Sequence, residues 1–205
     1  MQRILRLACL CGALAASTLQ AQSTLPAGTW RIPDAPAEMR DAVSRADLLI
    51  LSLQDALQRE LMGALAQGGP AFALQSCHID VVGTTRRIER QRDVHVGRTS
   101  DRLRNPANAP RPWAAALVKA NAGRSTRDVP GFAVDLGDAV GVLRPIAHQP
   151  MCDSCHGVTG QIDPAVRRAV QQRYPADSAT GFTTGEIRGW FWVEVPKTKH
   201  QPAGE

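Results

Sequence analysis

Residues 139–157, AVGVLRPIAHQPMCDSCHG, decide the fold class of this chain. The first half is rich in β-branched and apolar residues and predicts a strand. The second half contains the pattern C-x-x-C-H at Cys152, Cys155 and His156, which is typical of the attachment site of a c-type haem. Two thiols at this spacing can form thioethers with the two vinyl groups of one porphyrin. The adjacent imidazole can then ligate the iron.

Three other kinds of site share part of this pattern: a redox dithiol, half of a zinc site, and a plain disulfide. A zinc site needs four ligands, and no second C-x-x-C or H-x-x-x-H follows. A thioredoxin-like site has a strand before the motif and a long helix after it, whereas Pro150 and Gly157 bracket this one. The pattern therefore favours one covalent haem c, with a non-haem thiol redox protein as an alternative.

The bulk composition limits the class of protein. The 205 residues are 43% hydrophobic, which is enough for a single domain with a core of its own. The formal net charge is +5. The positive residues are scattered and no aromatic platform accompanies them, so we expect no nucleic-acid partner.

The first 21 residues read as a cleaved signal peptide. Arg3 and Arg6 precede the apolar run 7–16, and Ala21 closes a plausible cleavage site. The run is too short to cross about 30 Å of hydrocarbon, so we expect no membrane span in the mature chain. Bacterial haem c is attached outside the cytoplasm, and a periplasmic location therefore agrees with the motif. Cleavage leaves Cys77 as the one cysteine outside the motif.

Hydrophobic periodicity predicts helices first and strands later. Residues 22–36 read as an extended lead-in before a long helix over 37–66, which Gly68, Gly69 and Pro70 end. A shorter helix over 71–82 is expected to break at Gly83. The segment 86–112 is basic and rich in loops. The further elements expected are a strand at 94–98, a helix at 112–122, a hairpin at 131–136 and 139–146, a helix at 164–174 and a strand at 185–195.

This order predicts an α+β fold with a mainly antiparallel sheet. One domain is expected over 37–195, followed by a polar tail at 196–205. The motif is expected in a loop after the hairpin. A small helical cytochrome c instead carries the motif near its N-terminus.

Four segments together resemble a family of exported single-haem c proteins with a PAS-like fold, first seen in a cyanobacterial member. They are AFALQSCHIDVVG, GRTSDRLRNPANAP, PIAHQPMCDSCHG and RYPADSATGFTTGEIRGWFWVEV. The resemblance covers residues 37–195. It implies a PAS-like sheet, thioethers at Cys152 and Cys155, and His156 and Cys77 as the two axial ligands of the iron.

The residues by themselves leave the sixth ligand open between Cys77 and the adjacent His78, and the resemblance favours Cys77. Met151 and His148 lie close to the motif on the proximal side and are not expected to reach across the ring. His95 sits in a strand-like run and is expected to be an ordinary surface or core histidine. A thiolate ligand would lower the redox potential of the haem, whereas a Met/His pair raises it.

The arginines of the basic segment are candidates to pair with the two haem propionates, because guanidinium binds carboxylates in bidentate fashion. The candidates are Arg98, Arg102 and Arg104. The alternative is a solvated basic loop.

These features predict an exported mono-haem c protein of low potential. It either transfers electrons to an unknown partner protein or senses redox state or gases. The chain contains no kinase or cyclase segment, so a sensor would act through a partner. A peroxidase-like enzyme is a third possibility; it needs an open iron position, with His78 as the acid/base group.

Overall fold

The structure is a computed structural model that describes residues 25–92 and 94–197; for residues 75–84, 88, 91 and 92 it describes the backbone alone. The predicted signal peptide and nearly all of the predicted polar tail therefore lie outside the described residues. No helix in the described part of the chain is long and apolar enough to cross a bilayer.

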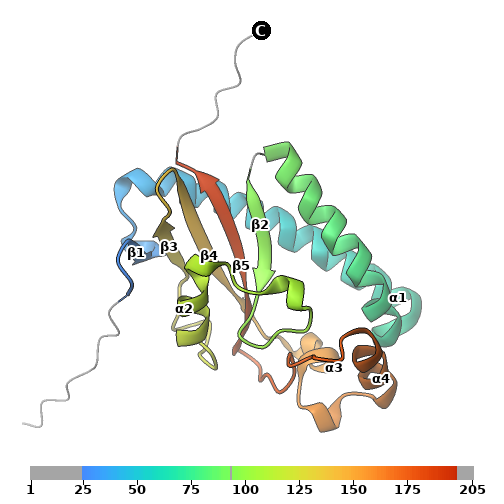
Figure 1. Ribbon diagram of the computed structural model, residues 1–205. Helices are drawn as coiled ribbons and strands as arrows, with labels where there is room; N and C mark the ends of the chain where they lie inside the picture. Colours follow the sequence, from blue (N-terminus) through green and yellow to red (C-terminus); the bar gives the residue numbers. More distant parts are fainter. Residues whose placement is uncertain (1–24, 93, 198–205) are drawn as a thin grey trace, which may run out of the picture.

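A five-stranded sheet forms the centre of the molecule (Figure 1). Its strand order is β1-β3-β4-β5-β2, and each neighbouring pair is antiparallel. The prediction of an antiparallel sheet in an α+β fold is thereby confirmed. The short β1, which pairs with β3, lies within the segment expected to be an extended lead-in. The strands are β1 (Thr29–Arg31), β2 (His95–Thr99), β3 (Phe132–Asp135), β4 (Ala139–Ala147) and β5 (Ile187–Pro196).

The predicted long N-terminal helix is the first arm of α1 (Arg40–Arg92). Gly68 and Gly69 depart from helical geometry, with φ of −158° and 70°, and divide α1 into two arms. The first arm passes behind the sheet, and the second turns back beside β2 (Figure 1). The other helices are α2 (Pro112–Ala120), α3 (Asp153–His156) and α4 (Pro164–Arg173).

Two local predictions were wrong. The second arm does not break at Gly83 but continues to Arg92, because a single glycine inside a helix costs only about 1 kcal/mol and is tolerated. The C-x-x-C-H motif is not in a loop. It occupies a 3₁₀ turn, Pro150–Cys152, that leads directly into α3. Proline is well suited to this first helical position because its φ is already close to the helical value.

The core forms a layer on each face of the sheet. The first arm of α1 covers one face, with Leu53 and Ala46 fully buried against Val142 and Val193. Burying one leucine side chain contributes about 1.5–3 kcal/mol. Helix α2 covers the other face, where Leu117 packs in one cluster with Trp190 and other apolar residues. Successive residues of β3 and β4 alternate between the two layers, as the pleat requires.

A third, smaller apolar cluster joins the motif to the bend of α1. Its buried residues are Ile162, Val166 and Val170, and Cys155 packs against them together with Ala71 and Leu74 from the start of the second arm. Helices α3 and α4 therefore lie beside the bend, at one end of the sheet (Figure 1). This cluster fixes the motif against the second arm.

Candidate functional site

The turns of the motif are closed by backbone hydrogen bonds. The Cys152 N–H donates to Gln149 O at 2.8 Å, and the Gly157 N–H donates to Asp153 O at 3.1 Å. A β-carbon at Gly157 would lie 2.8 Å from that same Asp153 oxygen. Glycine is therefore required directly after His156, because any side chain would push the turn apart.

The imidazole of His156 is held in one tautomer. Its Nδ1 lies 2.8 Å from the carbonyl oxygen of Ala179. A carbonyl can only accept, so Nδ1 carries the proton and Nε2 keeps its lone pair. Burial lowers the pKa of His156 well below 6.5, and the positive charges of Arg188 and Arg104 lower it further. The imidazole is thus neutral near pH 7, which is the form that ligates a metal.

The segment 177–182 runs alongside the motif and holds its backbone. Phe182 N–H donates to His156 O at 3.1 Å, and Gly181 N–H donates to Gly157 O at 2.8 Å. The Ala179 carbonyl comes from the same segment. Residues 177–182 therefore position both the backbone and the imidazole ring of His156.

Arg104 connects this segment to the motif. Its guanidinium donates to Cys155 O at 2.6 Å and to Ala179 O at 3.3 Å. It also contacts both carboxylate oxygens of Asp177, at 3.1 and 3.2 Å. Both side chains of the ion pair are nearly buried, 12% and 10% exposed. Arg104 is therefore engaged by protein groups and acts as a structural bridge.

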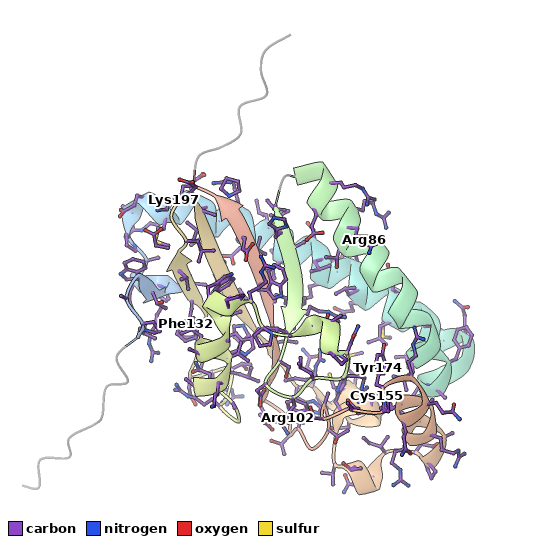
Figure 2. The ribbon with its side chains drawn as sticks, in the orientation of Figure 1. Arg86, Arg102, Phe132, Cys155, Tyr174 and Lys197 are labelled. Atoms are coloured by element: carbon purple, nitrogen blue, oxygen red, sulfur yellow. The ribbon has the colours of Figure 1, made fainter. Side chains whose placement is uncertain are left out.

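Arg102 is engaged in the same way. Its guanidinium lies 3.5 Å from the ring centre of Phe182, an arrangement that favours a cation–π interaction. It pairs with Glu186 and donates to Thr180 O at 3.0 Å. Figure 2 shows Arg102 at the same end of the molecule as Cys155.

His148 contacts the motif through Asp153. It is 1% exposed, and its Nε2 lies 2.7 Å from Oδ1 of Asp153. Asp153 lies between the two cysteines in the sequence. The His148 ring stacks on Phe182, with the centres 5.8 Å apart, and its buried Nδ1 has no hydrogen-bond partner among the residues that the structure describes. His148 therefore contacts the motif through Asp153 and Phe182.

The two cysteines are free thiols that project from consecutive turns. Burial raises the pKa of Cys155. The reactive thiol of a C-x-x-C redox pair is its first cysteine, so the raised pKa of Cys155, the second, does not separate a redox dithiol from a haem attachment site. Among the side chains that the structure describes, no group of three or more histidines, cysteines and carboxylates could hold a metal ion.

The structure therefore brings Cys152, Cys155 and His156 together on one short helical segment. The other predicted ligands, Cys77 and His78, lie on the second arm of α1, and their side chains are outside the described residues. Arg98 lies on β2, where it is paired in register with Phe191.

A hollow of about 590 Å³ lies at the opposite end of the sheet, lined by Trp113, Arg111, His95 and Glu194 among others. His95, at the start of β2, is 69% exposed and opposes Glu194. The motif instead follows the end of β4 that pairs with Ile187. Ile187 is seven residues from Glu194 along β5, which corresponds to about 23 Å at 3.3 Å per residue. The hollow and His95 are therefore remote from the motif.

Sequence reasoning missed several residues of the site. Asp177 and the carbonyl of Ala179 contact the motif from far along the chain, and nothing in their spacing indicates it. Asp153 could have been found, because a carboxylate between the two cysteines is placed to contact a nearby histidine. Arg188 was missed as well; it lies within electrostatic reach of His156 and Cys152.

Comparison with known proteins gives a consistent family assignment. The Tll0287-like family matches residues 34–196. The crystal structure of the cyanobacterial heme-protein Tll0287 superimposes with a TM-score of 0.56 at 23% identity, covering 82% of this chain and 100% of that one. At this identity the match concerns the fold. No curated protein matches the chain significantly.

Proposed function

The chain belongs to the Tll0287-like family, and from this and the geometry of the site we propose that it binds one haem c. In this proposal Cys152 and Cys155 form the thioethers and His156 is the proximal ligand of the iron. The haem supplies reversible one-electron chemistry and an iron atom that can exchange ligands. The work of the chain is to hold, orient and shield it.

One observation carries the proposal: His156 donates from Nδ1 to Ala179 O and keeps Nε2 available, directly after two thiols on one helical turn. A metal-ligating histidine commonly donates its other ring nitrogen to a carbonyl or carboxylate, because this fixes the ring and raises its basicity. The apolar surroundings of Cys155 also fit the edge of a porphyrin.

We propose Cys77 as the second axial ligand. Leu74, which packs in the cluster around Cys155, lies on the second arm of α1. Cys77 is three residues further along, and residues three apart on a helix share a face. His78 is four residues from Leu74, which is a same-face spacing as well. Helix geometry alone therefore does not separate the two residues; the family resemblance favours Cys77, and His78 remains the alternative ligand.

A His/Cys-ligated haem would have a low potential, because thiolate donation stabilises ferric iron. Two roles follow: electron transfer to a partner protein, or sensing through displacement of the thiolate. The mild positive charge of the chain would suit an acidic partner surface. We further propose a PAS-like assignment for the sheet, export through the N-terminal signal, and a periplasmic location.

Absorption and EPR spectra of the protein exported from a cell competent in haem c maturation test the proposal. The expected result is one covalent haem per chain that resists acid-acetone extraction, with a low-spin ferric signal of the thiolate type. Cys152→Ala combined with Cys155→Ala should abolish covalent attachment. Wild-type protein without bound haem would overturn the proposal.

The sixth ligand is tested by Cys77→Ser beside His78→Gln. Loss of the thiolate-type signal in Cys77→Ser alone is expected. Loss in His78→Gln alone would identify the histidine instead. Carbon monoxide binding to the ferrous protein separates the roles: prompt binding favours a sensor, and its absence favours electron transfer.

A further inference from the structure

Strand β5 contains one extra residue where it passes the motif. Ile146 of β4 pairs with Gly189, but the next residue, Ala147, pairs with Ile187. Arg188 therefore has no partner on β4, and the ladder has a bulge at this residue. Bulges of this kind commonly occur beside functional sites, where they redirect a side chain.

The burial of the neighbouring residues shows the effect of the bulge. Ile187 and Trp190 both pack in the cluster under α2, although strict alternation puts residues three apart on opposite faces. The extra residue resolves this conflict, and it turns Arg188 away from α2. Gly189 makes room for the bulge, because a β-carbon there would lie 2.7 Å from Thr99 O.

No carboxylate in the described part of the chain forms an ion pair with the redirected guanidinium. Its Nε is buried and has no hydrogen-bond partner among the described residues. Arg102 and Arg104 nearby are paired with Glu186 and Asp177. A buried guanidinium nitrogen left unpaired destabilises the fold, so the arrangement suits an anion that arrives with a ligand.

Arg188 lies beside the motif. It is within electrostatic reach of His156, Cys152 and Arg104. Arg188 is thus close to both the first thiol and the proximal histidine. Its backbone is fixed as well, because its carbonyl accepts from Ser100 Oγ at 2.8 Å.

We propose that the bulge at Arg188 presents its guanidinium to a carboxylate of the bound haem, and that Arg188 is the principal propionate partner, in place of Arg98 or Arg102. The inference rests on the proposed haem binding. Haem carries two carboxylates, and a guanidinium fork is the side chain best matched to that group. Arg102 already binds Glu186 and stacks on Phe182, so it has little capacity left.

The test uses the haem-loaded protein with Arg188→Gln, Arg188→Lys and Arg102→Gln. Arg167→Gln on α4 is the control for loss of one charge, because Arg167 is exposed. The readouts are the midpoint potential and the propionate bending mode in resonance Raman spectra. Arg188→Gln should lower the midpoint potential and shift the bending mode. Arg188→Lys should restore much of the potential but not the mode, because ammonium cannot bind as a fork.

Unchanged midpoint and bending mode in haem-loaded Arg188→Gln would overturn the inference while leaving the proposed function intact. The same holds for an effect found in Arg102→Gln and not in the Arg188 variants. Should Arg188→Gln fail to fold, Arg188→Lys decides: a wild-type bending mode overturns the inference and a shifted mode supports it. Wild-type protein without haem would overturn both proposals.

Discussion

The two ends of strand β5 differ in how a charged side chain is paired. Near the C-terminal end, Glu194 accepts from Arg111 at 2.8 and 3.0 Å and from Trp113 Nε1 at 2.7 Å. Near the other end, six residues away, Nε of Arg188 is buried and has no partner in the described part of the chain. The carboxylate at the first end is paired within the protein, whereas at the second end we propose that an anion of the ligand completes the pairing.

This difference distinguishes a structural end of β5, at Glu194, from the end beside the motif, at Arg188. A hollow lies beside Glu194, yet this largely buried carboxylate, 12% exposed, already has its hydrogen-bond partners. The motif end holds the neutral histidine, two thiols and a guanidinium nitrogen that has no partner among the described residues. Unsatisfied chemistry therefore marks the site.

The largest effect should come from Arg104→Leu. This change removes four hydrogen bonds and leaves Asp177 buried without its partner, which typically costs about 3–5 kcal/mol. Urea unfolding should show this loss, and covalent haem content should fall. Arg111→Leu, at the Glu194 end of β5, should cost about 1 kcal/mol and leave haem content unchanged. Equal haem content in both variants would contradict the distinction between the ends.

Gly157→Ala should have the next largest effect. The new β-carbon would meet Asp153 O at 2.8 Å, and such crowding costs about 1–3 kcal/mol. Thermal unfolding and haem content measure the effect. Gly160→Ala is the matched control, because a β-carbon there meets nothing within 4 Å. A similar loss in both variants would show that the motif turn has no special need for glycine.

Glu194→Gln should alter acid stability. Burial raises the pKa of Glu194, but the hydrogen bonds from Arg111 and Trp113 outweigh it and hold the pKa below 4.5. The carboxylate therefore stabilises the fold above pH 4.5, and this stabilisation is lost as the pH falls through the lowered value. The variant should be less stable by about 1 kcal/mol near pH 7. A difference that stays constant from pH 7 to pH 3 would contradict this.

Arg59→Gln on the first arm of α1 should change least. Its partner Asp55 is one helical turn away, and both side chains are more than 60% exposed, 68% and 63%. Such pairs contribute about 0.3–0.5 kcal/mol. The change in the free energy of unfolding of this variant, measured in urea, is the reference against which the three larger changes are compared.

Much of the fold could be predicted from periodicity. The long helix, its end at Gly68 and Gly69, and the hairpin of β3 and β4 all follow from local pattern. Strand β1 could not be predicted, because three residues form a strand only when β3 offers them an edge. The continuation of the second arm through Gly83 likewise overrides a local preference.

The site was predictable where its members are adjacent in sequence. Cys152, Cys155 and His156 share one turn, so their spacing alone indicates the chemistry. The roles of Arg104 and Arg188 depend on contacts with residues many positions away. Seven arginines between 86 and 104 look equivalent in the sequence, and only their partners tell them apart.

The bulge at Arg188 is not needed for the packing of its own strand. Deleting Arg188 would place Ile187 two residues before Trp190, and simple two-residue alternation would then keep both side chains in the cluster under α2. The deletion would remove the guanidinium beside the motif and leave the apolar face of the strand in register. The extra residue at this point in the chain therefore adds a side chain beside the motif without a change in the packing under α2.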